Sequence, residues 1–506
     1  MMKGYELFQR EIPILDGKFQ INKPTGGEMV VDIYNDIKKV VNEKITTCTM
    51  TNLPAYKKEM SATNQANLAQ LYFHVNVTFM NANKPYEDYY IALHDYFFEK
   101  FTGSMVKNMV KELKLDDKTV PLDDRLKKMD SYIKETISLD DHYDYKYEYK
   151  DIFKVKKMTE NMSFSLYKEV LEYIKVPYKY VCTTDKFENQ FDNNRVVPGT
   201  LTEYLLYVPE TKKYFSPQYY WMPYGPAVSV SIDNEAAFYE PLGGMGVRAK
   251  LEFSKIPSGS MNDNVNTTES EIQLAPDMET VSVKKKTTYT GYSAFYYRSA
   301  VQYVKPNKIK DFIHDVAFDG VDTDIKKYTI ENKEYHNNYD DSKPFTINAE
   351  VQVKESWLEN AGKNYIISIG KVLGEQPSLY QETERINPIV LSSPKKFIHT
   401  ITFKIAAGYV VNDLKSLEFN KEIDNLKAVT KPEKGKPTPK PSKKEEKREV
   451  IGKFSSTAKL DGDTITISIE EFYNFVHLDK EKYNEYRDVI NASFDFSKAT
   501  VLLTKV

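Results

Sequence analysis

Cysteine, tryptophan and long apolar runs are scarce in this chain of 506 residues, which has only two cysteines and two tryptophans. Cys48 and Cys182 are too few for a disulfide framework, so we expect both thiols to be free. No run of about 18 apolar residues is present, and no transmembrane helix is expected. The net charge of −3 gives no indication of a nucleic-acid partner.

An apolar leader is missing too. The N-terminal stretch contains Glu6, Arg10, Glu11 and Asp16 and lacks the apolar segment of a signal peptide. This absence predicts a cytoplasmic protein if the start of the chain is genuine.

Motifs that hold metals or cofactors are also missing. No two of the seven histidines have the four-residue spacing with a glutamate that a zinc hydrolase helix needs. There is no glycine-rich phosphate loop and no Gly-x-Ser-x-Gly elbow, and residues 461–463 form a turn rather than a calcium loop. We therefore expect neither a metal nor a cofactor.

The chain is rich in tyrosine, with 38 residues, and hydrophobic residues make up 41% of it. A chain of this length fits three or four domains. Tyrosine-rich strands suit antiparallel sheets, where each ring packs its body and keeps its hydroxyl in water.

Periodicity in the first half predicts strands followed by helices. Residues 5–80 alternate and carry turn signals, which indicates strands that end with residues 71–79. From Tyr86 the apolar spacing becomes helical, and a second helix runs from Met105 to Leu113. A third is predicted over 122–137, with two aspartates near its N-terminus, where carboxylates are favoured.

The second half is predicted to be rich in strands. Residues 307–316 are expected to form a short helix, and 479–491 a longer one. Residues 431–448 are rich in lysine and proline and are interpreted as a solvated insertion; the alternative is attraction to an anionic surface. The clearest strands are expected over 271–283, 287–304, 345–353, 365–369, 397–405, 454–460, 464–469 and 499–503.

Residues 158–217 contain the most informative pattern. Phe164, Tyr167, Leu171 and Ile174 recur at helical spacing, which predicts an amphipathic helix. A strand over 178–182 and a hairpin over 201–217 follow. This order resembles the core of the bacterial transglutaminase-like fold, a papain-like α+β fold.

The resemblance places all three catalytic positions of that family on unsuitable residues. Glu160 stands at the cysteine, Glu203 at the histidine and Ser216 at the aspartate, while Pro217 keeps its place. Acyl transfer needs a thiolate, an imidazole and a carboxylate that holds the imidazole. A carboxylate at position 160 is a poor acyl nucleophile, and Glu203 would repel it.

Two other side chains are weighed as nucleophiles. Cys182 falls in the strand after the helix, where we expect it to pack as a small apolar residue. Ser163 lies on the helix, but no histidine occurs between positions 142 and 314 to activate it.

The resemblance extends over most of the chain and implies a four-part organisation. Residues 1–84 would be the C-terminal half of an N-terminal β-sandwich, and 85–245 a degenerate transglutaminase-like core. Residues 246–384 would form a β-rich domain, and 385–506 a C-terminal β domain that contains the insertion. Segments 52–59 and 385–389 carry short family motifs. The first half of the sandwich is absent, and family members are generally exported, which implies the periplasm or cell envelope.

We therefore expect a catalytically inactive transglutaminase-like protein that acts as a binding or scaffold module. Its partner would be a protein, a peptide or a polyamine-like ligand, because two converging carboxylates favour a cation. The acidic, tyrosine-rich segment 140–151 could contribute carboxylates, although a surface loop is the simpler interpretation. The alternative is an active cysteine or serine hydrolase or acyltransferase with a relocated nucleophile.

Overall fold

The protein is a multidomain α+β chain whose computed structural model falls into two compact units. Unit 1 comprises Met1–Ser258 and Asn387–Ser392, and unit 2 comprises Gly259–Ile386 and Ser393–Val506. The structure describes residues 3–23, 27–34, 37–42, 44–65, 68–77, 85–97, 103–140, 151–194, 196, 199–242, 248–340, 342–354, 357–379, 384–426 and 448–506.

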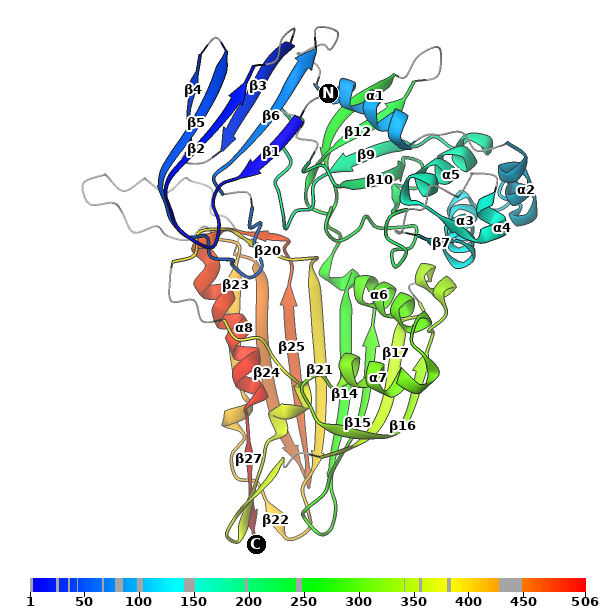
Figure 1. Ribbon diagram of the computed structural model, residues 1–506. Helices are drawn as coiled ribbons and strands as arrows, with labels where there is room; N and C mark the ends of the chain where they lie inside the picture. Colours follow the sequence, from blue (N-terminus) through cyan, green and yellow to red (C-terminus); the bar gives the residue numbers. More distant parts are fainter. Residues whose placement is uncertain are drawn as a thin grey trace. The chain divides into compact units, whose positions relative to one another are not determined.

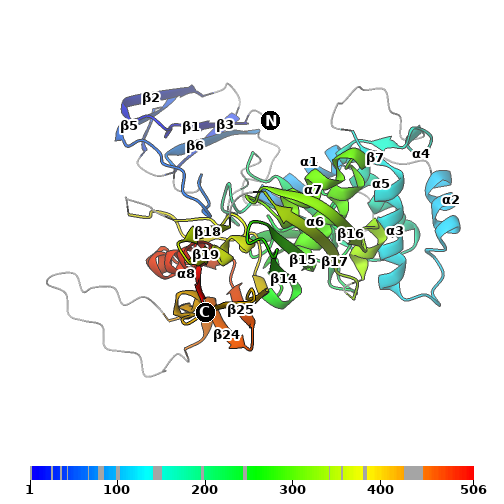
Figure 2. The same ribbon diagram turned by 90° about the horizontal axis from the view of Figure 1, so that it is seen from below.

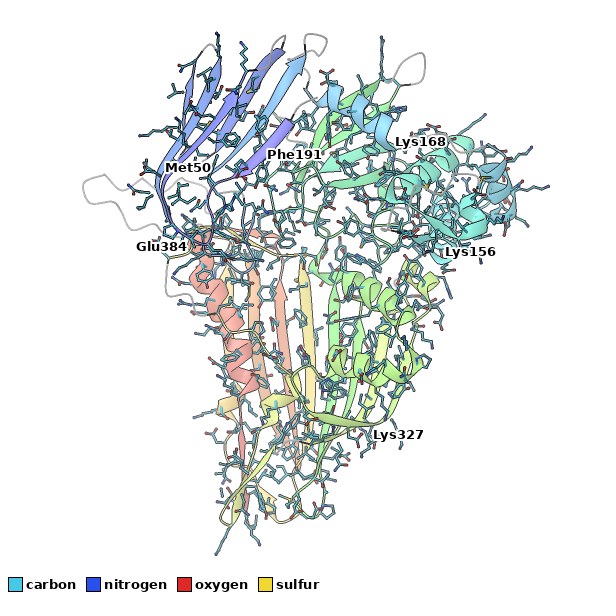
Figure 3. All side chains as sticks on the ribbon, in the orientation of Figure 1. Met50, Lys156, Lys168, Phe191, Lys327 and Glu384 are labelled. Carbon is cyan, nitrogen blue, oxygen red and sulfur yellow. The ribbon has the colours of Figure 1, made fainter. Side chains whose placement is uncertain are left out.

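The N-terminal part of unit 1 is a small β-sandwich (Figure 1). Its antiparallel sheets have the strand orders β1-β6-β3 and β2-β5-β4. Both sheets contribute to one core, in which Cys48 is fully buried and Met50, labelled in Figure 3, is 2% exposed. The strands are β1 (Lys3–Leu7), β2 (Ile14–Asn22), β3 (Gly27–Tyr34), β4 (Lys38–Val41), β5 (Ile45–Leu53) and β6 (Gln70–Val77).

Helices and then a five-stranded antiparallel sheet follow in unit 1, in the order that the sequence predicts. The sheet has the order β11-β10-β9-β12-β13. Two-residue strands β7 (Ser138–Leu139) and β8 (Lys157–Met158) pair beside the helices. The helices are α1 (Pro85–Phe97), α2 (Gly103–Leu113), α3 (Leu122–Thr136), α4 (Ile152–Val155) and α5 (Glu160–Tyr173); the strands are β9 (Lys179–Thr183), β10 (Glu203–Val208), β11 (Lys213–Phe215), β12 (Glu235–Pro241) and β13 (Ala249–Lys255).

A buried charge network fixes α3 against the rest of this part. Asp130 accepts hydrogen bonds from the Tyr167 hydroxyl at 2.6 Å and the Tyr224 backbone N–H at 3.0 Å. Its carboxylate also pairs with Lys134 at 3.1 Å, and both side chains are completely buried. Such a pair is stable only when further hydrogen bonds support it, and here the Lys134 ammonium also donates to the Met222 carbonyl.

Residues from segments 52–59 and 385–389 meet in unit 1 although they are far apart in the sequence. The Glu59 carboxylate accepts hydrogen bonds from the Asn387 backbone N–H at 2.8 Å and from its side chain at 2.9 Å. Val390, in the two-residue strand β20 (Ile389–Val390), donates its N–H to the Ser61 carbonyl. These hydrogen bonds attach residues 387–392 to the rest of unit 1.

Unit 2 is built on an eight-stranded sheet with the order β16-β17-β15-β14-β21-β25-β24-β23. All neighbours are antiparallel except β14 and β21, which are parallel. Strands from both expected segments, 246–384 and 385–506, share this sheet. The strands are β14 (Val265–Leu274), β15 (Val281–Tyr289), β16 (Thr323–Glu331), β17 (Phe345–Val353), β21 (Lys395–Lys404), β23 (Phe419–Asp424), β24 (Val450–Asp461) and β25 (Thr464–Tyr473).

One face of this sheet is covered by helices. In both views α8 (Tyr483–Ser497) lies over β23 and β24, and α6 (Gly291–Gln302) and α7 (Ile309–Ala317) lie over β15 to β17 on the same side (Figures 1 and 2). The smaller elements of unit 2 are β18 (Leu358–Ala361), β19 (Asn364–Ile367), β22 (Tyr409–Val410), β26 (His477–Leu478) and β27 (Val501–Lys505).

Two strand predictions are wrong in unit 2. Residues 271–283 are not one strand, because a turn around Asp277, whose carboxylate accepts the Glu279 N–H, separates β14 from β15. Residues 287–304 do not continue as a strand, because α6 begins at Gly291. Gly291 has φ +55°, and a Cβ there would lie 2.1 Å from the Asn264 side chain. Only glycine fits this position, where the chain turns from β15 into α6.

Two predicted features lie largely outside the described residues. Residues 141–150 of the acidic segment and 431–447 of the insertion lie outside them. Among described residues, no helix is long and apolar enough to cross a membrane.

Candidate functional site

The helix of the informative segment places Glu160 at its first position. Thr159 caps α5, and its hydroxyl accepts the Met162 N–H at 3.3 Å. One face of α5 is buried through Phe164, Tyr167 and Leu171, three of the residues whose spacing predicts the helix. Glu160 is exposed at the N-terminus of α5, where a carboxylate is favoured.

Glu203 opens strand β10 and is only 4% exposed. The Tyr219 hydroxyl donates to one carboxylate oxygen at 2.7 Å, and the Thr202 hydroxyl donates to the other at 3.2 Å. Burial raises the pKa of Glu203, and the charges of Asp185 and Glu160 raise it further, while the two hydroxyl donors oppose the rise. Glu203 is thus held in place in a position that disfavours its charged form.

A single side chain connects Glu160 to the start of β10. Gln218 donates from its amide to the Glu160 carboxylate, and its carbonyl oxygen accepts the Tyr204 N–H at 3.1 Å. The structure therefore brings the residues at the expected cysteine and histidine positions into one cluster.

Ser216, at the third expected position, follows β11 directly and is completely buried. Its hydroxyl has no hydrogen-bond partner in the described part of the chain, while its backbone carbonyl accepts the Tyr219 N–H at 3.0 Å. Ser216 thus shapes the turn that carries Tyr219, and no hydrogen bond joins its hydroxyl to either carboxylate.

Sequence reasoning missed Gln218, Tyr219 and Asp185 in this cluster. Asp185 follows the end of β9, and burial raises its pKa as well. Gln218 and Tyr219 come directly after Pro217, the one position at which the sequence agrees with the pattern it was compared with. Pro217 could have pointed to these two residues, because the residues that follow it extend the hairpin toward the start of β10.

The two candidate nucleophiles are poorly placed for attack. Cys182 is completely buried and pairs across the sheet with Tyr204 and Ala237. Burial and the nearby Glu203 raise the pKa of its thiol, which disfavours the reactive thiolate. Ser163 is also fully buried, and its hydroxyl donates to the Glu160 carbonyl at 2.6 Å.

No group of three or more histidine, cysteine, aspartate or glutamate side chains in the described ranges is arranged to hold a metal. His314 contacts the Val321 carbonyl at 2.8 Å, in unit 2, and His142 lies outside the described ranges.

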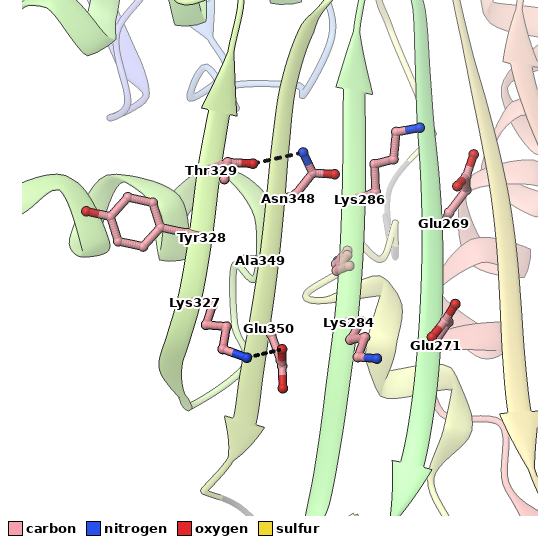
Figure 4. A pocket seen from close by; sticks show the side chains of 11 residues that line it. Glu269, Glu271, Lys284, Lys286, Lys327, Tyr328, Thr329, Asn348, Ala349 and Glu350 are labelled. Atoms are coloured by element: carbon pink, nitrogen blue, oxygen red, sulfur yellow. Dashed lines mark hydrogen bonds and ion pairs between the residues drawn. The ribbon is translucent and has the colours of Figure 1, made fainter.

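A shallow groove of about 310 Å³ lies on the helix-free face of the unit 2 sheet (Figure 4). Charged residues face it in a cross-strand row in which Glu271, Lys284, Glu350 and Lys327 alternate in sign. Lys327 pairs with Glu350 at 3.7 Å. Because opposite charges stand side by side, this row presents no net charge that would select a charged ligand.

Comparison with known proteins gives a fold and no family. No protein-family model matches the chain, and no curated protein matches it. The chain is similar to a crystal structure from Parabacteroides distasonis ATCC 8503 named a "putative protease". The TM-score is 0.54 at 13% identity, over 99% of this chain and 74% of that one. At this identity the likeness supports a multidomain α+β fold and assigns no activity.

Proposed function

We propose that this protein is a catalytically inactive, transglutaminase-like binding module that takes a cationic group at Glu160 and Glu203. The order of α5, β9 and the β10–β11 hairpin supports the transglutaminase-like interpretation of residues 85–245. A role at the bacterial cell envelope is part of the proposal and rests on the family resemblance alone.

The observation that carries the proposal is the identity of the side chains in the cluster. Glu160 and Glu203 stand at the positions that the resemblance assigns to a thiolate and an imidazole, and two carboxylates supply neither an acyl nucleophile nor a base that activates one.

A cation is the ligand that this cluster favours. Bringing a second negative charge near a desolvated carboxylate is unfavourable, and a bound ammonium group would relieve the repulsion. Glu160 is exposed and reachable, whereas Glu203 is held by Tyr219 and Thr202. A primary amine, a lysine side chain or a polyamine fits this arrangement.

A thermal-shift titration with amines and basic peptides tests the ligand class. We expect spermidine and lysine-containing peptides to raise the unfolding temperature of the wild type, and Glu160→Gln/Glu203→Gln to abolish the shift. Glu252→Gln is the matched control, because Glu252 is an exposed carboxylate of the same sheet, on β13. Stabilisation that survives the double substitution unchanged would rule out the carboxylates.

A separate assay tests the inactivity. The purified chain should show neither amine incorporation nor peptide hydrolysis. Activity that disappears in Cys182→Ala or Ser163→Ala would establish the alternative, a hydrolase or acyltransferase with a relocated nucleophile.

A further inference from the structure

The start of strand β10 is paired on one side and open on the other. Strand β9 runs beside β10 (Figure 1) and pairs with it at residues 203–207, whereas β11 pairs with it only at residues 206–208. Continuing the second register by two residues would place Pro217 opposite Tyr204, and a proline has no N–H to donate to a neighbouring strand. The chain turns away at residues 216–219 instead, where a backbone hydrogen bond of 3.0 Å closes the turn.

The side chain of Gln218 occupies this edge of β10. Its amide oxygen accepts the Tyr204 backbone N–H at 3.1 Å, and its amide nitrogen lies 3.5 Å from the Thr202 carbonyl oxygen. The same nitrogen donates to the Glu160 carboxylate. One nitrogen and one oxygen on a single carbon atom therefore contact two acceptors and one donor that the protein presents together.

The amide of Gln218 can be replaced by a group from solution. Glu160 and Thr202 are exposed and Gln218 is half-buried, so a ligand can reach all three. The amide is carried on a flexible side chain, which can swing away without a change in the backbone. An ammonium group is also a stronger donor to a carboxylate than a neutral amide is.

We propose that this edge binds the N-terminal residue of a peptide, whose free α-amino group displaces the Gln218 amide. The inference rests on the proposed function and narrows its ligand from amines in general to one class. In an N-terminal residue the ammonium nitrogen and the carbonyl oxygen are joined through adjacent carbon atoms, so they can take the places of the two amide atoms. The ammonium would donate to the Glu160 carboxylate and the Thr202 carbonyl, and the carbonyl would accept the Tyr204 N–H.

Other ligands match the same groups less well. A lysine side chain or a polyamine has no oxygen beside its ammonium group, so it would leave the Tyr204 N–H without the acceptor that Gln218 supplies. The interior of a peptide offers an N–H and a carbonyl but no charge, and it would gain less from Glu160 and from the nearby Glu203. A free α-amino group followed by a carbonyl meets all of these groups.

The test is calorimetric titration of the full chain at about pH 6.5, where an α-amino group is protonated. The probes are trialanine amide, its N-acetylated form, propylamine and spermidine. We expect trialanine amide to bind the wild type about tenfold more tightly than propylamine, because only the peptide supplies an acceptor for the Tyr204 N–H. The acetylated peptide should not bind.

Two variants test the edge itself. Gln218→Ala should strengthen the binding of trialanine amide several-fold, because the ligand no longer competes with the amide for the same groups. Glu160→Gln should weaken it about tenfold, through the loss of a charge-assisted hydrogen bond. Gln20→Ala is the matched control: Gln20 is an exposed glutamine of another sheet whose amide donates to Thr47 at 3.1 Å, and its loss should leave binding unchanged.

Each outcome decides the proposal. Equal affinity for trialanine amide and propylamine, equal affinity for the free and the acetylated peptide, or unchanged affinity in Gln218→Ala would overturn it. If spermidine still binds the wild type and not Glu160→Gln/Glu203→Gln, such a result leaves the proposed amine site standing; if no amine binds at all, both proposals fail. The comparison of free and acetylated peptide uses the wild type alone, so it decides even if a variant does not fold.

Discussion

Two buried carboxylates of unit 1 have hydrogen-bond partners within the protein, whereas an ammonium group and an imidazole nitrogen of unit 2 have none in the described part of the chain. Asp130 is engaged by Tyr167, Tyr224 and Lys134, and Glu203 by two hydroxyls. Among the described residues of unit 2, Lys395 has no hydrogen-bond acceptor and Nδ1 of His399 has no hydrogen-bond partner. The difference indicates that hydrogen bonds fix the first set within the architecture, whereas Lys395 is held by contacts with the Phe397 and Tyr473 rings.

The largest expected effect comes from breaking the engaged network. Asp130→Ala leaves Lys134 buried without a counter-ion and should destabilise unit 1 by about 3–5 kcal/mol. The two tryptophans allow each unit to be followed separately, because Trp221 lies in unit 1 and Trp357 in unit 2. Urea unfolding monitored by Trp221 in a Trp357→Phe background measures this change.

Asp123→Ala is the control for this prediction. Asp123 pairs with Lys127 and Lys213 at a partly exposed site, so its loss should cost less than about 1 kcal/mol. Equal costs for Asp130→Ala and Asp123→Ala would show that the buried network is not important for stability.

Acid should destabilise unit 2 through His399. Its folded pKa of about 3 lies below the unfolded value of 6.5, so its stabilising effect is present above pH 6.5 and is lost as the pH falls toward 3. The loss should reach about 2 kcal/mol at about pH 5, at about 1.4 kcal/mol for each pKa unit. Trp357 fluorescence in a Trp221→Phe background reports it, and His399→Gln should remove that part of the pH dependence.

Glu203 should give unit 1 a smaller pH dependence of the opposite sign. Its folded pKa is raised, so its stabilising effect is present below the unfolded pKa of 4.5 and is lost as the pH rises through the folded pKa. The stability of Glu203→Gln relative to wild type should therefore increase from about pH 4.5 to neutrality. Glu252→Gln should change in the other direction, because Lys179 lowers the pKa of Glu252. Equal slopes for both variants would contradict this explanation.

The smallest expected signal is the reactivity of the thiols. Cys48 and Cys182 are both buried, and burial raises the pKa of each. Neither should react with a disulfide reagent at neutral pH until the chain unfolds, when both should react. Rapid labelling of Cys182 in Cys48→Ser without unfolding would support a relocated nucleophile instead.

Local patterns predicted much of the fold, and long-range pairing explains most of what was missed. The helical spacing of 122–137 predicted α3, which ends at Thr136, and the alternation of 345–353 predicted β17. The aromatic run after Gly291 resembled a strand, but its buried positions, which include Phe295 and Arg298, follow a helical repeat.

Long-range pairing also limited what the sequence could predict about the polar clusters. Glu160 and Glu203 were predicted because a known fold order connects them. No sequence signal pairs Lys395 with Tyr473, because strand register is set by packing across the sheet rather than by local composition. The orphan nitrogen of His399 likewise depends on which neighbours surround it.

The hydrogen bonds between Glu59 and Asn387 join a late segment of the chain to unit 1, and this affects both gene recombination and proteolysis. The chain leaves unit 1 after Ser258, returns for residues 387–392 and leaves again, so three peptide links join the two units. A gene segment that ends at codon 258 would encode a unit 1 whose Glu59 lacks Asn387 and whose buried Lys186 lacks the Ser392 carbonyl that accepts its ammonium at 2.9 Å. One protease cut between the units could not separate them, and neither unit can be shuffled into another protein as one contiguous piece.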